Sequence, residues 1–236
     1  MAPTAVIIGA GINGFCVADA LLQKRWRVTV ADRGRIPNPL AASHDHHRVI
    51  RAHYPDEPTF CRRAEAALQA WEALWDRIGV RRYHQTGILA LCSSAGDWTD
   101  RCRRVFDQCD VQYRQLSPSE LCRDYPFLNV ADLNYGLLTE SGGVLMAADI
   151  LADLTRSLRR RGATLIENFD ADTISVSSAR ARATGGQTLQ GDILVAAAGT
   201  GISALLDDII PERFTPTCRW TRSNSNSFGN LLVPVS

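Results

Sequence analysis

The stretch TAVIIGAGING, residues 4–14, joins a short β-favouring apolar run to a cluster of three glycines. Apolar residues at helical spacing follow the cluster, from Val17 to Leu22, and a second β-favouring run, RVTVAD, ends at Asp32. A strand, a helix and a strand within about 30 residues form a βαβ unit. The sequence therefore predicts an α/β fold that begins with parallel strands.

The glycine cluster has the spacing of a dinucleotide-binding turn. Gly9 permits a tight turn out of the strand, Gly11 leaves room for a pyrophosphate, and Gly14 lets the helix pack close to the sheet. The first turn of the helix, which includes Asn13, offers free N–H groups and a partial positive charge to phosphates. A glycine-rich turn that binds no ligand is the alternative interpretation.

An acidic residue ends the second strand at a suitable distance from the glycines. Asp32 follows Gly14 by 18 residues, close to the spacing of a carboxylate that accepts hydrogen bonds from ribose hydroxyls. We include the neighbouring Arg33 in the predicted site. A carboxylate at this position disfavours the 2′-phosphate of NADP.

A polar segment, SHDHHRVIR, occupies residues 43–51. It predicts no metal site, because the adjacent His46 and His47 cannot both point inward from regular structure. Arg48 and Arg51 are three residues apart, and on a helical turn they would share one face. Two guanidinium groups on one face would bind a carboxylate or a phosphate. A solvated loop without function is the alternative.

The remaining chain alternates between the two periodicities. We expect helices at 58–79, 98–109 and 150–162, and a short helix that starts with the capping box Ser117-Pro118-Ser119-Glu120. We expect strands at 86–92, 135–139, 164–166 and 192–197, and a β-hairpin around Gly185-Gly186.

Composition argues against several classes of protein. The net charge of +1 gives no support for a nucleic-acid partner. No apolar stretch reaches the roughly 20 residues of a transmembrane helix, and the first apolar run lacks a preceding basic region. Seven cysteines, an odd number without a CxxC pair, favour reduced thiols over a disulfide framework or a zinc site. We therefore expect a soluble, cytoplasmic protein.

Over residues 4–210 the chain resembles the D-amino-acid oxidase-like family of FAD-dependent amine oxidoreductases. Within that family it is most similar to the branch of monomeric sarcosine oxidase and N-methyl amino acid oxidases. Five segments carry the resemblance in order: the glycine motif to Asp32, Ser43-His44 with Arg48 to Arg51, TGIL at 86–89, GGVL at 142–145, and AAG at 197–199.

The resemblance implies a Rossmann-type FAD-binding domain and a partial α+β substrate domain. The FAD domain would comprise residues 1–85 and 140–210, and the substrate domain residues 86–139. Residues 211–236 would begin the return of the chain to the substrate domain or form an irregular tail. Members of the family continue for well over a hundred residues more, so the resemblance implies that the C-terminal part is lacking.

The resemblance also implies roles for individual residues. His44 and Arg48 would lie beside the flavin ring, with Ser43 and Gly199 also near the cofactor, and Arg51 would bind the substrate carboxylate. The reaction would be oxidation of an amino acid or N-alkyl amino acid, with hydride transfer to FAD, an imine product and formation of hydrogen peroxide.

Three alternatives for the function stay open. One is a glycine or D-amino-acid oxidase type of enzyme, and another is an FAD amine dehydrogenase that passes electrons to a different acceptor. The third is a non-catalytic fragment or one subunit of a split oxidoreductase. A small amine or amino acid is the expected ligand, without a nucleic-acid or membrane partner. An unpaired strand edge near Thr86 would favour self-association or a complementing chain.

Overall fold

The computed structural model describes residues 1–206 and 233–234. The chain divides into two compact units, each with its own core. Of the described residues, the first unit comprises 1–46 and 147–206, and the second comprises 47–146 and 233–234.

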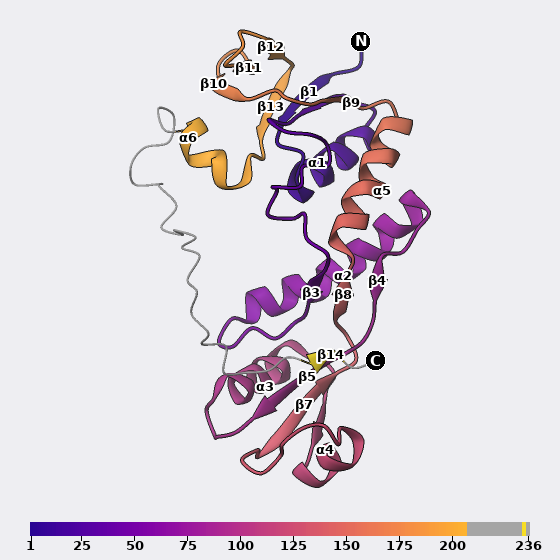
Figure 1. The fold of residues 1–236 in the computed structure, drawn as a ribbon, viewed down its shortest axis with the longest axis vertical. Helices are drawn as coiled ribbons and strands as arrows, with labels where there is room; N and C mark the ends of the chain where they lie inside the picture. The colour runs from indigo at the N-terminus through magenta and orange to yellow at the C-terminus, as the bar shows by residue number, and fades with distance from the viewer. Residues whose placement is uncertain (207–232, 235–236) are drawn as a thin grey trace. The chain divides into compact units, whose positions relative to one another are not determined.

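The first unit contains a parallel sheet, an antiparallel sheet and two long helices (Figure 1). Its elements are β1 (Thr4–Ile8), α1 (Ile12–Gln23), β2 (Arg27–Ala31), α5 (Ala147–Arg160), β9 (Thr164–Ile166), β10 (Ala171–Ser175), β11 (Arg180–Ala183), β12 (Thr188–Gln190), β13 (Ile193–Ala196), the 3₁₀ turn η1 (Gly199–Gly201) and α6 (Ile202–Leu206).

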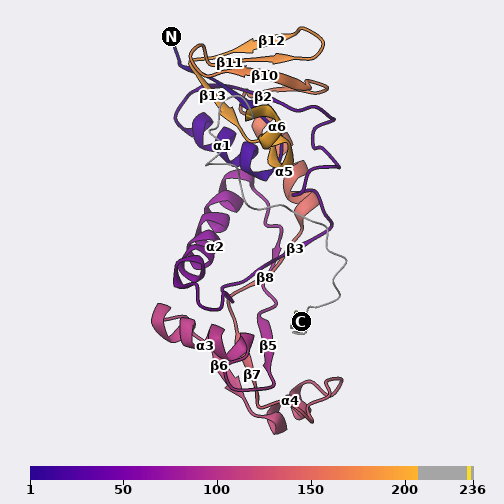
Figure 2. The same cartoon turned by 90° about the vertical axis from the view of Figure 1, so that its left-hand side faces the viewer.

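The parallel sheet has the order β13-β1-β2-β9, so β1 is flanked by β13 and β2. Helices α1 and α5 pack together beside this sheet, and the three antiparallel strands β10-β11-β12 cover it from the opposite side (Figure 2). Alternate residues of β1 serve the two layers: Ile7 faces the start of α1, whereas Val6 and Ile8 belong to a buried cluster with Phe169. The predicted α/β fold is confirmed.

The second unit consists of short antiparallel sheets and three helices. Its elements are β3 (Arg48–Ile50), α2 (Pro58–Ile78), β4 (Tyr83–His84), β5 (Ile88–Cys92), α3 (Trp98–Cys109), β6 (Arg114–Leu116), α4 (Pro118–Asp124), β7 (Tyr135–Thr139), β8 (Gly143–Leu145) and β14 (Val233–Pro234).

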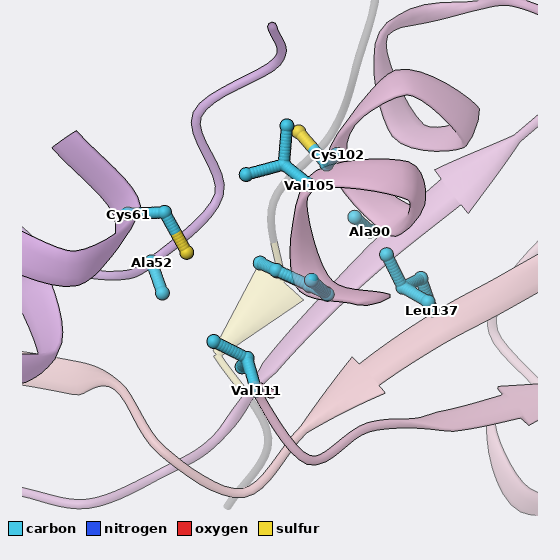
Figure 3. Close-up of a cluster of buried hydrophobic side chains, with 8 residues drawn as sticks. Ala52, Cys61, Ala90, Cys102, Val105, Val111 and Leu137 are labelled. Carbon is cyan, nitrogen blue, oxygen red and sulfur yellow. The ribbon is translucent and has the colours of Figure 1, made fainter. Parts of the chain in front are cut away.

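The main core of the second unit lies between two helices and a sheet of order β14-β5-β7-β6. Figure 3 shows Cys61 from α2, Cys102 and Val105 from α3, and Leu137 from β7 in one buried cluster. The opposite face of the sheet packs Leu89 against α4. Because successive side chains of β5 point to opposite faces, Leu89 packs on one side of the sheet and Ala90 on the other.

Local signals located the helix ends well. Gly79 follows α2 in the left-handed conformation with φ +77°, as expected of a C-terminal glycine. The side chains of Ser117 and Glu120 form the predicted capping box, with Pro118 in the first turn of α4.

The prediction of a helical turn at Arg48–Arg51 is wrong. Residues 48–50 form strand β3, which pairs antiparallel with β8 and places Ile50 opposite Gly143. The β-branched pair Val49-Ile50 favours this extended conformation. Arg48 lies in this strand and Arg51 directly follows it, so the two arginines do not share a face of a helical turn.

The boundaries between units differ from the expected domain limits. Residues 47–85 and 140–146, expected in the FAD domain, group with the second unit. The physical cause is pairing: β8 holds both β3 and β4, and α2 packs on α3. The strand after Thr86 is also not a bare edge, because β14 pairs with Ile88 and Leu89.

Six of the seven cysteines lie in the described residues and are free thiols. Cys218 lies outside the residues that the structure describes. Within residues 1–206 and 233–234, the helices are too short or too polar to cross a lipid bilayer.

Candidate cofactor site

The carboxyl ends of the parallel strands bring several predicted residues to one edge. The N–H of Gly9 donates to Ala31 at 2.8 Å, and the N–H of Asp32 donates to Ile166 at 3.0 Å. On the other side of β1, the N–H of Ala197 donates to Ile8 at 2.7 Å, shortly before Gly199. Open α/β sheets bind ligands outside this edge.

Gly9 and Gly14 are required by the packing of the chain itself. Gly9 has φ +109°, and a Cβ there would lie 2.4 Å from the carbonyl oxygen of Ala197. A Cβ on Gly14 would lie 1.9 Å from the carbonyl oxygen of Gly9. These contacts match the two structural roles expected for the first and third glycines.

Gly11 has a different environment. It precedes α1 with φ −77° and ψ −179°, which any residue adopts. Among the described residues, the one atom that would lie within 4 Å of a Cβ at Gly11 is the hydroxyl oxygen of Ser43, at 3.3 Å. That hydroxyl accepts a hydrogen bond from the N–H of Ile12, the first residue of the helix, at 3.1 Å. Ser43 therefore caps α1 from a distant loop, because Gly11 has no side chain to do so.

The Asp32 carboxylate is buried, with 8% of its residue surface exposed, and it accepts hydrogen bonds from three protein donors. Its Oδ2 accepts from the N–H of Ala10 at 2.8 Å. Its Oδ1 accepts from the N–H of Gly34 at 2.9 Å and from Nδ2 of Asn38 at 2.7 Å. Asp32 thus joins the glycine turn to the loop that follows β2.

The other predicted residues of the first unit lie in the first turn of α1, in the loop after β2 and in η1. Asn13, Arg33 and Gly199 are exposed. His44 is half-buried, and its N–H donates to Ala41 at 2.8 Å. The structure therefore brings Gly9, Gly11, Gly14, Asp32 and Ser43 into one connected network.

Arg48 and Arg51 belong to the second unit. Arg48 is exposed at the start of β3. The Arg51 guanidinium donates through Nη1 to the carbonyl of His53, and its Cζ lies 5.4 Å from the Tyr54 ring centroid and 5.2 Å from that of Trp98. Both rings contribute cation–π attraction that orients the guanidinium.

His53, a residue that the sequence did not single out, is fully buried beside Arg51. Its ring stacks on Trp98 at 6.2 Å and meets Phe106 edge-on at 4.8 Å, and neither ring nitrogen has a hydrogen-bond partner among the described residues. Burial, followed by the charge of Arg51, lowers the pKa of His53 to about 3. Its ring is therefore neutral at physiological pH.

Sequence reasoning also missed Asn38, the side-chain partner of Asp32. A signal was present: Asn38 stands between two prolines, a context typical of a turn in which the side chain bonds the backbone. No local signal connects Trp98 to Arg51, because Trp98 is 47 positions further along the chain.

A separate pocket of about 550 Å³ lies in the second unit. Its lining includes Glu65, Cys109, Arg114 and Glu140 but none of the predicted site residues. Within residues 1–206 and 233–234, no three histidine, cysteine, aspartate or glutamate side chains are grouped as metal ligands.

The first-unit network fits the adenosine diphosphate half of FAD. Gly11 has no side chain to keep a phosphate from its backbone, and it stands at the positive end of α1. Asp32 lies at the end of the neighbouring strand, where a carboxylate can accept hydrogen bonds from the ribose hydroxyls.

Comparisons with known proteins agree with this arrangement. Peroxisomal sarcosine oxidase of Homo sapiens is 26% identical over 230 residues, which cover 95% of this chain and 59% of that protein. The chain thus spans about three-fifths of the length of this curated relative.

Solved structures share the fold. NikD, an amino acid oxidase essential for nikkomycin biosynthesis, superposes with a TM-score of 0.73 at 22% identity, covering 87% of this chain and 54% of that one. L-proline dehydrogenase from P. horikoshii gives a TM-score of 0.75 at 18% identity, and the match covers 87% of this chain and 55% of that one. The model of the DAO family, described as FAD dependent oxidoreductase, matches residues 4–223. The chain belongs to the DAO family of FAD-dependent oxidoreductases.

Proposed function

We propose that the chain binds FAD through its first unit and serves in the oxidation of an amino acid or N-alkyl amino acid. The observation that supports this best is the environment of Gly11. Backbone contacts require Gly9 and Gly14, whereas Gly11 has backbone angles that any residue adopts, and among the described residues a Cβ there would press only on the Ser43 hydroxyl, at 3.3 Å. A glycine at this position is explained by a ligand that approaches the backbone.

The residues around Gly11 have suitable chemistry for the cofactor. The Ser43 hydroxyl accepts from the Ile12 N–H, so its own proton is available to donate to a phosphate oxygen. Asp32 provides an acceptor for a ribose hydroxyl. When bound, FAD supplies an acceptor for the hydride that leaves the carbon next to the amine nitrogen.

Arg51 is our candidate for binding the substrate carboxylate. One guanidinium nitrogen is engaged by the His53 carbonyl, and Tyr54 and Trp98 orient the group. Its remaining N–H groups suit a carboxylate. Sarcosine and proline, which appear in the names of two relatives, both carry this group. By the family resemblance, His44 and Arg48 are proposed to lie near the flavin ring.

A second candidate function is that of one subunit of a split oxidoreductase, in which this chain binds FAD and a second polypeptide contributes to the substrate site. The chain spans 54–59% of the length of each relative compared above.

The flavin content of the purified protein tests the proposal. Gly11→Val would place a side chain in the phosphate position, so we expect loss of the flavin absorbance with an unchanged far-UV circular dichroism spectrum. Gly185→Val is the matched control, because no atom lies within 4 Å of a Cβ there. Full flavin occupancy in Gly11→Val would show that the site is wrongly assigned.

Turnover tests the reaction. We expect an active preparation to oxidise sarcosine, glycine, L-proline or D-alanine, with peroxide detection for an oxidase and an electron-accepting dye for a dehydrogenase. A flavin-loaded preparation that requires a second polypeptide for any turnover would favour the second candidate.

A further inference from the structure

Asn38 is a buried polar residue in the loop after β2, with 6% of its surface exposed. Its Oδ1 accepts from the N–H of Leu40 at 2.9 Å, which forms a local turn. Its Nδ2 donates to Oδ1 of Asp32 at 2.7 Å. The turn uses only the oxygen of the amide, so the bond from nitrogen to Asp32 is an additional interaction.

The hydrogen bonds of Asp32 leave an acceptor on one particular oxygen. A carboxylate offers about four lone-pair positions, two on each oxygen. Oδ1 accepts from Gly34 and Asn38, whereas Oδ2 accepts from Ala10 alone among the residues that the structure describes. The remaining position therefore lies on Oδ2, the oxygen next to the glycine turn, and a ribose hydroxyl is a donor that suits it.

The same loop reaches the phosphate side of the network. The carbonyl of Asn38 accepts from Ala41 at 3.1 Å, and the carbonyl of Ala41 accepts from His44 at 2.8 Å. Ser43, between these residues, bonds the first N–H of α1. Asn38 thus connects the Asp32 carboxylate, expected to bind ribose, to the loop that carries the Ser43 hydroxyl, expected to bind a phosphate.

We propose that Asn38 is a positioning residue for the cofactor: it holds Asp32 so that Oδ2 faces the ribose hydroxyls of the adenosine half, and it fixes the loop of Ser43. This inference rests on the proposed binding of FAD. Asn38 would act through Asp32 and the loop of Ser43, without touching the cofactor itself.

Asn38→Asp separates this role from that of a simple turn former. The substitution retains the size of the side chain and its Oδ1, but it replaces the donor with an acceptor next to the Asp32 carboxylate. Asn129→Asp is the matched control: Oδ1 of Asn129 accepts from Ala131 at 3.1 Å in the same kind of turn, at an exposed position in the second unit.

The experiment is titration of the purified chain with ADP, FAD and FMN at pH 7.5 and pH 5, each variant being compared with the unmodified chain at the same pH. We expect Asn38→Asp to weaken ADP and FAD binding at least tenfold at pH 7.5. At pH 5 the deficit should shrink, because two carboxyl groups this close share a proton that restores the donor.

Asn129→Asp should bind ADP and FAD like the unmodified chain. FMN has no adenosine, so Asn38→Asp and the unmodified chain should bind FMN with the same affinity. Unchanged ADP affinity in Asn38→Asp at pH 7.5, or a deficit that is equal at both pH values, would overturn the role of Asn38 while leaving FAD binding intact. An unmodified chain that binds neither ADP nor FAD would overturn the proposed function instead.

If Asn38→Asp fails to fold, Asn38→Ala provides the second variant, with Asn129→Ala as its control. Each removes an amide oxygen that accepts from the N–H two residues further on, but only Asn38→Ala also removes a donor to Asp32. We expect Asn38→Ala to bind ADP at least tenfold more weakly than the unmodified chain and Asn129→Ala to bind it equally well. Equal ADP affinity in the two alanine variants would overturn the inference.

Discussion

A Cβ on Gly14 would lie 1.9 Å from the carbonyl oxygen of Gly9, so the first turn of α1 rests directly on the end of β1. The obstructing atom belongs to the backbone and cannot rotate away. We expect Gly14→Ala to lower the free energy of unfolding by at least about 3 kcal/mol, the upper range for overpacking. Gly185→Ala, where a Cβ meets nothing within 4 Å, should unfold like the unmodified chain in denaturant titrations. Equal stability of both variants would contradict this packing.

Arg161 and Asp19 form a largely buried ion pair that joins α1 to the end of α5. Nη1 of Arg161 donates to Oδ1 of Asp19, and the two side chains are 29% and 5% exposed. Removing the cation leaves a buried carboxylate with reduced compensation. We expect Arg161→Met to lower the free energy of unfolding by about 3 kcal/mol.

The exposed pair of Arg123 and Asp124 provides the control for this prediction. Arg123→Met should produce no measurable change in a urea titration. The double variant Asp19→Leu with Arg161→Met should be more stable than Arg161→Met alone, since it also removes the buried carboxylate. Additive losses in the double variant would show that the two side chains are not coupled.

His53 should make the second unit sensitive to acid. In the folded chain burial and Arg51 lower the pKa of His53 to about 3, whereas an unfolded histidine takes up a proton below about pH 6.5. Because the unfolded state binds more protons between these values, stability falls as the pH decreases. The slope should approach 1.4 kcal/mol per pH unit, roughly one proton.

Urea titrations between pH 7 and pH 4 measure this dependence, since His53→Phe should remove most of the slope. His84→Phe is the control, because His84 is exposed. An unchanged slope in His53→Phe would mean that other groups account for the acid sensitivity.

Arg51 should determine recognition of the substrate carboxylate. Loss of a buried charge-assisted hydrogen bond costs about 2–5 kcal/mol. In an active preparation, Arg51→Ala should reduce kcat/KM for amino acids at least tenfold while sparing an amine without a carboxylate. Arg63→Ala, which removes an exposed arginine lying 5.8 Å from the Phe60 ring centroid, should affect neither substrate. An equal loss for both substrates would point to folding or flavin binding.

We also expect residues 1–236 alone to bind FAD weakly, to self-associate or to require a partner, and to show little amine oxidase activity. Strand β6 is an edge of its sheet among the described residues, and unpaired edges favour association. Size-exclusion chromatography beside the peroxide assay measures both properties. A monomer with robust turnover would contradict this expectation.

The sequence by itself determined the features that depend on neighbouring residues. The βαβ start, the glycine turn and the ends of α2 and α4 follow from short patterns, because hydrophobic periodicity and capping act within a few positions. The roles of Gly9 and Gly14 were predictable for the same reason: their spacing fixes where a helix meets a strand.

Only the tertiary structure decided the features that depend on distant pairing. The segment at Arg48 became a strand because β8, nearly a hundred residues later, pairs with it. Trp98 reached Arg51 through the packing of the second unit, and Asn38 reached Asp32 through the course of a loop. Such contacts depend on the three-dimensional path of the backbone, whereas helix periodicity and capping are encoded locally.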